Sequence, residues 1–452
     1  MRSHWGSKIG FILAMAGSAI GLGNIWRFPY LVAQNGGGAF LLIYLICVVF
    51  LGYFLLASKL TFGRVAQTNI VDAFQKVSPK KVSGLWGKCV GYANLFNVFL
   101  LVSVYAIVIG WTLSYVATGV RNLFEIKPLE INASLFETLA SSYFEQLFWI
   151  VLSLFVTGQI LIKGVRKGIE KMSLYLMPIL FLLLILMVCR MAFIPNAQEG
   201  FKYLFYPNWE RLGFGLGGFE WRTFAHITLL ALGQAIYSLS LGVGVCFIYG
   251  SYLGNGIDIK RSALYVAGFD TLVAILASMI VVPAVFTFNL ELNQGTTLSF
   301  VTLPFVFKQM FGGKIIMLAF FVLLFFGALT SIVSMYEPLI NIITEKMKLN
   351  RKKATYSVLA VNLGLSFIVL ASFTGVLSFK IFGRNLFDMF DYLTGTYTFG
   401  MFELVICVFM GWKIFPQISD DLNLKSNFLK AYFCFILRWL APAIFLLLFL
   451  TA

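Results

Sequence analysis

The chain of 452 residues is 60% hydrophobic and 12% charged, whereas soluble domains are usually about 45–50% apolar and about 25% charged. Soluble cores of ordinary size cannot hide so many apolar residues, which include 48 phenylalanines, so soluble, disordered, collagenous and disulfide-rich classes are excluded. The net charge of +15 falls in short Lys and Arg clusters between long apolar runs. This pattern is typical of the loops of a membrane protein, not of a nucleic-acid-binding surface.

Eleven apolar segments are each long enough to cross a bilayer as a helix, which takes about 20 residues. In chain order they cover residues 9–33, 38–63, 89–118, 144–162, 169–194, 222–253, 262–289, 315–344, 354–373, 385–411 and 428–450. We therefore expect a multi-pass protein of the cell (inner) membrane, with the lipid bilayer as its surroundings and without nucleic acid as a partner.

Basic residues are concentrated in the loops on the same side as the N-terminus. Most of the 34 Lys and Arg residues fall in these loops. Lys59 and Arg64, at the end of the second segment, are expected to belong to the same group of loop residues. The positive-inside rule then predicts a cytoplasmic N-terminus. An odd number of spans places the C-terminus outside.

Two segments contain glycine pairs and small polar residues in mid-membrane. The first reads AGSAIGLGN over residues 16–24, and the sixth reads QAIYSLSLGVG over residues 234–244. Each glycine costs about 1 kcal/mol in helix propensity, and an unwound turn frees backbone groups that lipid cannot satisfy. A close helix crossing through small residues is one interpretation. Two breaks five segments apart favour another, namely inverted repeats around a transport site, at residues 1–194 and 195–411, followed by an accessory span at 412–452.

The residues near these breaks favour a carboxylate and a small monovalent cation as ligands. N–H groups at half-helix N-termini suit a carboxylate, and free carbonyl groups suit a hard cation. Neutral oxygen atoms come from Asn24, Ser238, Ser240, Thr330 and Ser331.

Charged residues inside a membrane are costly and are usually functional. Asp270 is a candidate for binding, and Asp391 with Arg27 is a candidate gate on the outer side. Satisfied interhelical hydrogen bonds are the alternative for both aspartates. A structural role is the preferred interpretation for three other charged residues in the spans, Glu337, Glu403 and Arg438.

Three motifs carry a resemblance to a known family: Trp5–Gly10, Ala16–Tyr30 and Asn35–Phe40. Together with Gly233–Gly244 and Phe326–Ser331, they make the chain resemble the neurotransmitter:sodium symporter family over nearly its whole length, and above all its bacterial members of the LeuT and MhsT type. The resemblance implies an all-α integral membrane protein with the LeuT fold, which has eleven transmembrane helices, a 5+5 inverted repeat and broken helices 1 and 6. It also implies sodium-coupled import of an amino acid by alternating access.

The resemblance further implies roles for individual residues. The first sodium site would comprise Ala19, Asn24, Ser238 and Asp270. The second would comprise Gly17, Ile20, Gly327, Thr330 and Ser331. The substrate would contact Ala19, Gly21, Leu22, Gly23, Leu101, Tyr105, Tyr237, Ser238, Ser240, Val243, Ile332 and Met335. The gates would comprise Arg27 and Asp391 outside, and Arg2, Trp5, Ser251, Tyr252 and Glu345 inside. Gly168 and Pro178 would allow helix 5 to unwind.

Single positions narrow the expected ligands. Gly21 stands where the family's monoamine carriers have an acid, so the resemblance implies an amino acid whose own carboxylate completes the first sodium site. The apolar side-chain pocket favours a hydrophobic or aromatic amino acid. Asp270 would bring a fixed negative charge beside the family's chloride position, so two Na⁺ ions are expected without a chloride requirement.

Other functions on the same fold stay open at this point. An amino-acid-binding membrane sensor or receptor would bind the same ligand without transporting it. A channel would need a continuous pore, which two closing gates disfavour, and no catalytic constellation predicts an enzyme. The sequence leaves open the exact amino acid and whether the chain forms a homodimer.

Overall fold

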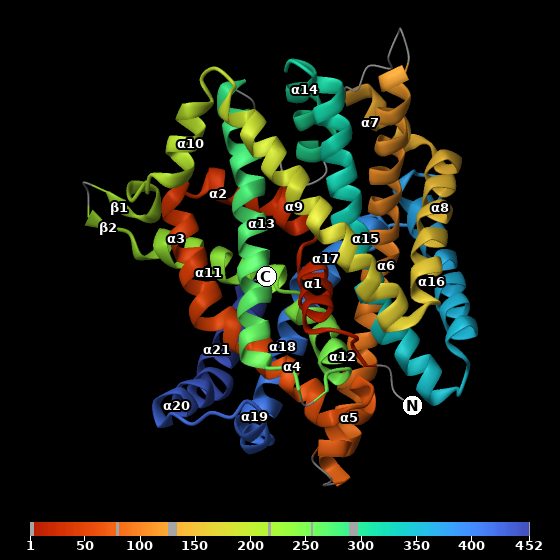
Figure 1. Ribbon diagram of the computed structural model, residues 1–452, viewed down its shortest axis with the longest axis vertical. Helices are drawn as coiled ribbons and strands as arrows, with labels where there is room; N and C mark the ends of the chain where they lie inside the picture. The colour runs from red at the N-terminus through yellow and green to blue at the C-terminus, as the bar shows by residue number, and fades with distance from the viewer. Residues whose placement is uncertain are drawn as a thin grey trace.

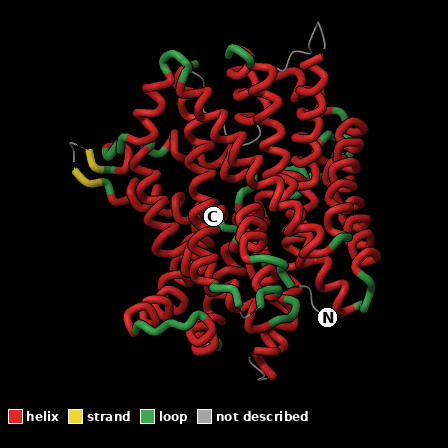
Figure 2. The backbone as a smooth tube through the Cα atoms, in the orientation of Figure 1, coloured by secondary structure: helices red, strands yellow, loops and turns green. Residues whose placement is uncertain are grey.

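The computed structural model describes residues 4–77, 81–124, 133–215, 218–254, 256–288 and 297–451. Within these residues nearly all regular structure is helical (Figure 2), and the helices stand side by side in one bundle (Figure 1). A two-residue hairpin at the edge of the bundle pairs β1 (Phe214–Gly215) antiparallel with β2 (Gly218–Phe219). We call the end with α7, α10 and α14 the upper end and the end with α5 and α19 the lower end, as in Figure 1.

The helices follow one another in chain order, and short 3₁₀ or π-helical turns carry the label η. The first part of the chain forms α1 (Lys8–Ala19), η1 (Gly23–Arg27), α2 (Phe28–Gln34), α3 (Gly38–Cys47), η2 (Val48–Gly52), α4 (Tyr53–Ala66), α5 (Ile70–Val77), α6 (Lys81–Phe124), α7 (Ala133–Ser141), α8 (Tyr143–Leu161), η3 (Val165–Glu170), α9 (Lys171–Ala192) and α10 (Ala197–Phe205). The second part forms η4 (Glu210–Leu212), α11 (Trp221–Ser238), η5 (Leu241–Val243), α12 (Val245–Ser251), α13 (Ile259–Thr287), η6 (Leu298–Thr302), α14 (Leu303–Lys308), α15 (Gly313–Lys346), α16 (Arg351–Phe373), α17 (Leu386–Tyr392), η7 (Leu393–Tyr397), α18 (Thr398–Trp412), α19 (Phe415–Asp421), α20 (Asn427–Phe435), η8 (Ile436–Leu440) and α21 (Ala441–Thr451).

The predicted spans correspond to helices. Among the described residues, nine helical runs are long and apolar enough to cross a membrane, and Lys8–Ala19 with Gly23–Gln34, bent by 58°, makes a tenth. The remaining predicted segment, 222–253, is divided by a break into α11 and α12. The largest difference in length is at α6, whose 44 residues include polar turns before the apolar run begins.

Helix α8 illustrates how the outer helices meet both protein and lipid. Phe148, Val151 and Phe155 form one exposed stripe, while Ile150 and Leu154 on the opposite face are buried. Residues three or four apart share a helix face, so α8 is apolar on both of these faces. Such a helix belongs between a protein core and hydrocarbon, and the chain is a multi-pass membrane protein.

The first broken helix crosses the middle of the bundle. Helix α1 ends at Ala19, where Ile20 leaves the helical conformation with φ −74° and ψ 81°. Helical structure resumes at Gly23 and continues into α2. The long helices α9, α13 and α15 pack against α1 and hold this break in place.

The second broken helix lies next to the first. Helix α11 ends at Ser238, and α12 begins at Val245 after the single turn η5. Ser240 and Gly244 on either side of η5 are both left-handed, with φ 53° and 69°. Gly244 suits this conformation, and a Cβ atom there would lie only 2.8 Å from the side chain of Asn94.

Candidate functional site

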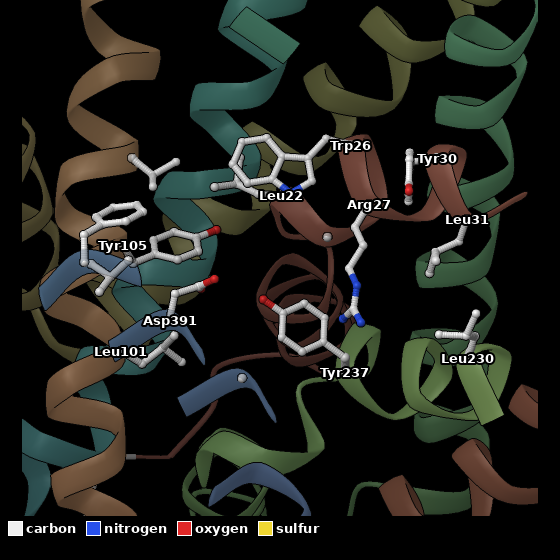
Figure 3. A pocket seen from close by; sticks show the side chains of 15 residues that line it. Leu22, Trp26, Arg27, Tyr30, Leu31, Leu101, Tyr105, Leu230, Tyr237 and Asp391 are labelled. Atoms are coloured by element: carbon white, nitrogen blue, oxygen red, sulfur yellow. The ribbon is translucent and has the colours of Figure 1, made fainter. Parts of the chain in front are cut away.

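A cavity of about 580 Å³ opens beside the first break. Residues from η1, α2, α6, α11 and α17 line it, and Figure 3 shows Arg27, Tyr237 and Asp391 pointing into it. The guanidinium carbon of Arg27 lies 5.2 Å from the centroid of the Tyr237 ring, a distance at which a cation and a ring attract each other. In the described part of the chain, Arg27 and Asp391 form no ion pair. The two predicted outer-gate residues therefore share one cavity without closing it.

A smaller cavity of about 50 Å³ lies at the break itself. It shares Leu22, Gly23, Leu101, Tyr105 and Tyr237 with the larger cavity, so the two adjoin. All of the predicted substrate residues except one line the smaller cavity. The exception is Ile332, which is fully buried in α15 and is not part of the lining. Residues predicted for other roles or for none also line it, namely Ser18, Asn24 and Ser331.

Two polar features of the smaller cavity suit a carboxylate. The hydroxyl of Tyr105 is buried and has no hydrogen-bond partner among the described residues. Leu22 and Gly23 stand at the start of the half-helix formed by η1 and α2. The first N–H groups of a helix lack intrahelical partners and lie at the positive end of its dipole. A hydroxyl and a helix N-terminus together make an anion-binding arrangement.

A buried polar cluster around one carboxylate, that of Asp270, adjoins the smaller cavity. Asn24 donates from its side-chain amide to Asp270 Oδ1 at 2.7 Å and to the Asp270 carbonyl at 3.2 Å. Ser238 donates to Asp270 Oδ2, and its hydroxyl lies 3.1 Å from Asn24 Oδ1. Ala19 lines the same cavity. The structure thus gathers the four residues predicted for the first sodium site, and their carboxylate, amide and hydroxyl oxygens fit a hard cation.

Backbone carbonyl groups of the first break converge on α15. The Ser331 hydroxyl lies 3.4 Å from the Gly17 carbonyl oxygen, 3.3 Å from that of Ser18 and 3.5 Å from that of Ile20. One hydroxyl has a single proton and cannot satisfy three acceptors. Thr330 adds a second hydroxyl, 3.0 Å from the Gly327 carbonyl oxygen. All five residues predicted for the second sodium site are therefore close together, and their neutral oxygen atoms fit a monovalent cation.

Four of the predicted inner-gate residues, Trp5, Ser251, Tyr252 and Glu345, are described by the structure, and each is hydrogen-bonded toward the lower end. Trp5 donates from its indole nitrogen to the Tyr249 carbonyl at 3.0 Å, and Ser251 donates to the Ile248 carbonyl at 2.6 Å. Arg2 lies outside the described residues.

Tyr252 and Glu345 belong to a wider polar network at this end. The Tyr252 hydroxyl donates to Glu337 at 2.8 Å, and Arg351 holds both carboxylate oxygens of Glu337 at 2.9 and 2.6 Å. Glu345 accepts from the Asn69 side chain at 2.7 Å and from Asn341 at 3.3 Å. The structural interpretation of Glu337 agrees with this geometry.

The start of helix 5 is a π-helical turn. Gly168 lies inside η3, and Pro178 lies inside α9, which follows directly. Glu170 in η3, which the sequence analysis did not single out, accepts from the Gly6 N–H and from the Ser7 hydroxyl, both at 2.7 Å. π-turns lack the ordinary hydrogen-bond ladder and occur often where helices change conformation. This carboxylate thus ties the segment before α1 to that turn.

The expectation for Lys59 and Arg64 was wrong. Lys59 is not a solvated loop residue, since it is only 3% exposed in α4 and it donates to Glu403 of α18 and to the Leu241 carbonyl. Arg64 is also buried and pairs with Asp421. Lys59 tolerates burial because a carboxylate neutralises it. One signal in the sequence could have indicated this pair. Glu403 lies in the middle of segment 385–411, which contains no Lys or Arg, so a basic partner had to come from another segment.

Comparisons with known proteins identify the family of the chain. The chain matches the Sodium:neurotransmitter symporter family over residues 2–125 and 120–452. It is 36% identical over 457 residues to the uncharacterized sodium-dependent transporter YhdH of Bacillus subtilis, covering 99% of this chain and 97% of that protein. It is 31% identical over 465 residues to an uncharacterized sodium-dependent transporter of Haemophilus influenzae, covering 100% of this chain and 98% of that one.

A solved structure extends the likeness to three dimensions. The crystal structure of MhsT in complex with L-phenylalanine is 35% identical in sequence, superposes with a TM-score of 0.87 and covers 100% of both chains. The predicted LeuT fold is therefore confirmed. The chain belongs to the sodium:neurotransmitter symporter family and is a sodium-dependent transporter.

Proposed function

We propose that the protein imports a hydrophobic or aromatic L-amino acid by alternating access, driven by two Na⁺ ions and without chloride. The observation that carries the proposal is the smaller cavity at the first break. There the unpartnered Tyr105 hydroxyl and the N-terminus of the η1–α2 half-helix stand beside the buried Asp270 cluster. A substrate carboxylate bound by the Tyr105 hydroxyl and the half-helix N-terminus would also face a cation held by the Asp270 cluster.

The lining supports an apolar substrate side chain. Leu101, Val243 and Met335 line the smaller cavity, and none of the residues identified in its lining is charged. Gly21 in the same lining supplies no acid for an amine. The similar protein MhsT was crystallised with L-phenylalanine, which supports an aromatic amino acid as a substrate here.

Two cations would act at different places. One, held by Asn24, Ser238 and Asp270, would neutralise the substrate carboxylate. The other would join the carbonyl groups of α1 to the hydroxyls of α15, so that its release frees α1 to move. The driving force is the Na⁺ gradient, to which the membrane potential adds about 2.3 kcal/mol per charge per 100 mV. The π-turn η3 beside α1 is the place where helix 5 would unwind.

The orientation follows from the charge pattern. We propose that the lower end and the N-terminus face the cytoplasm of a cell (inner) membrane, with the C-terminus outside. The larger cavity, with Arg27 and Asp391, would then be the outer entrance, and the network around Tyr252 and Glu345 would be the closed inner gate.

Labelled L-phenylalanine uptake into proteoliposomes tests the function. An inward Na⁺ gradient should drive uptake above equilibrium, choline in its place should not, and unlabelled leucine and methionine should compete better than glycine or lysine. Sodium-dependent binding without accumulation or counterflow would contradict transport and would favour an amino-acid sensor on the same fold.

A matched pair of variants tests the site. Tyr105→Phe removes the hydroxyl proposed to bind the carboxylate, and loss of a hydrogen bond to a charged group should weaken substrate binding about tenfold. Tyr115→Phe, also in α6, is the control, because its hydroxyl donates to the Phe300 carbonyl at 3.2 Å, away from the smaller cavity. Equal effects of the two variants would contradict the assigned role of Tyr105.

A further inference from the structure

Side-chain donors from three residues lie at the carbonyl groups of the second break. Four consecutive carbonyl oxygens, those of residues 239–242, are involved. Cys246 Sγ lies 3.5 and 3.3 Å from the first two oxygens, Lys59 Nζ donates to the third, and Asn94 Nδ2 donates to the fourth at 3.2 Å. These donors come from α12, α4 and α6 respectively, so three different helices hold the break.

Lys59 is the charged member of this set. Its side chain is 4% exposed, and that of its partner Glu403 is fully buried. Burying an ammonium group alone is costly, and Glu403 neutralises it. A carboxylate oxygen and a backbone carbonyl oxygen around one positive charge are the ligands that a monovalent cation would take. Here the positive charge is part of the chain.

The carbonyl that Lys59 holds lies in the wall of the substrate cavity. Ser240 and Val243, on either side of Leu241 and Gly242, both line the smaller cavity. Ser240 also donates to the Ser18 carbonyl of the first break at 2.9 Å. A shift of residues 240–243 would therefore change the cavity wall and its link to the first break together.

We propose that Lys59, neutralised by Glu403, is a positioning residue for the substrate cavity and serves as the built-in cation of the second break. It fixes the Leu241 carbonyl and so the conformation of residues 240–243, and no mobile cation binds there. The inference rests on the proposed function in that Ser240 and Val243 contact the transported amino acid.

The test removes both charges at once, because a single substitution would leave a buried charge unpaired and could prevent folding. The variant Lys59→Met/Glu403→Gln keeps similar volumes but offers no ammonium to the Leu241 carbonyl. The matched control is Arg64→Met/Asp421→Asn. This control removes an ion pair whose basic residue, Arg64, is also in α4. Arg64 donates to the Ile257 carbonyl and not to a carbonyl of the second break.

Two measurements on the purified full chain decide between positioning and general stability. The first is equilibrium binding of labelled L-phenylalanine in saturating Na⁺. We expect it to weaken at least about tenfold in the Lys59–Glu403 variant and to change little in the control.

The second measurement is the rate at which N-ethylmaleimide alkylates Cys246, followed by mass spectrometry. Cys246 is 1% exposed, and its thiol contacts the break, so loosening of the break should raise its rate at least about fivefold. Cys47 in α3, which is also buried, is the internal reference.

The outcomes separate the two proposals. Parental binding together with a protected Cys246 in the Lys59–Glu403 variant would overturn the positioning role. An equal loss of binding in the Arg64–Asp421 control would overturn it as well. Absence of sodium-dependent binding in the parent would contradict the proposed function, and the Cys246 rate alone would then decide whether Lys59 holds the break.

Discussion

The two breaks carry similar glycine-rich sequences but face different neighbours. At the first break, the carbonyl groups of Gly17, Ser18 and Ile20 lie around the hydroxyl of Ser331, and the Ser240 hydroxyl donates to the Ser18 carbonyl as well. At the second break, the carbonyl groups of residues 239–242 receive donors from Cys246, Lys59 and Asn94. The donors identified at the first break are neutral hydroxyls, whereas those at the second break include the charged ammonium group of Lys59.

This difference indicates how one motif can serve two purposes. A buried carbonyl without a donor costs about 1–3 kcal/mol, so an under-donated break attracts a mobile cation and can release it. A break whose carbonyls are held by the protein keeps its shape whether or not ions are bound. We infer that the first break is the ion-binding element and the second is the fixed wall of the substrate cavity.

The largest expected effect comes from removing the hydroxyls at the first break. Thr330→Val/Ser331→Ala deletes both side-chain oxygens of the proposed second sodium site. With about 1.4 kcal/mol lost per ligand, the Na⁺ concentration for half-maximal binding should rise about 100-fold, and uptake driven by Na⁺ should disappear. Sodium titrations of labelled L-phenylalanine binding would measure the shift.

Thr344→Val is the control for this experiment. Thr344 is also in α15, and its hydroxyl donates to its own helix at the Ile340 carbonyl, 2.8 Å away and remote from the break. A sodium shift of similar size in Thr344→Val would show that α15 responds to any lost hydroxyl, and the comparison between the breaks would fail.

A smaller effect is expected from the charge beside the first break. Asp270→Asn keeps the shape of the cluster with Asn24 and Ser238 but removes its fixed negative charge. We expect sodium affinity to fall about tenfold and binding to become stimulated by chloride, which then supplies the missing charge. Binding measured in chloride and in gluconate tests this, and identical curves for the variant and the parent in both salts would contradict the charge argument.

The second break should respond in a different way. Asn94→Leu removes the donor to the Gly242 carbonyl. Loss of one hydrogen bond with a net contribution of about 1 kcal/mol should weaken substrate binding about fivefold. The sodium midpoint at saturating substrate should stay at the parental value. If the Na⁺ concentration at half-maximal binding changed as much as the substrate affinity, the Gly242 carbonyl would belong to an ion site and the comparison would be wrong.

The smallest effect is expected far from both breaks. Asp72 in α5 accepts from Lys346 at 2.6 Å. Partial burial acts to raise the pKa of Asp72, but the hydrogen bonds from Lys346 and Asn69 outweigh it and hold that pKa below the ordinary value of 3.8. The pair therefore stabilises the fold above the unfolded-state pKa, and its contribution is lost as the pH falls through the lowered value.

Thermal unfolding of Asp72→Asn measures this contribution. At pH 7 the variant should be less stable than the parent by less than about 1 kcal/mol, and the difference should shrink at about pH 3. Sodium and substrate binding should be unchanged. A large change in either would mean that the lower end is coupled to the breaks.

Much of the fold could be predicted because it depends on local composition. Apolar length predicted the spans, and the mid-membrane glycines at residues 16–24 and 234–244 predicted where two helices break. The resemblance to the family named the candidate site residues before any coordinates. The structure brings the predicted substrate residues together around one cavity, with the exception of Ile332, while Arg2 lies outside the described residues.

Only the tertiary structure decided which polar groups meet. Lys59 and Glu403 are 344 positions apart, and the sequence around Lys59 resembles an ordinary loop end. Glu170 and the segment before α1 are joined across 164 positions in the same way. Hydrophobic periodicity and helix propensity depend on residues within a few helical turns. The partner of a buried charge depends instead on how helices that are distant in the sequence pack together. The sequence alone therefore determined where the chain breaks, and the packing determined which side chains donate to the carbonyl groups of each break.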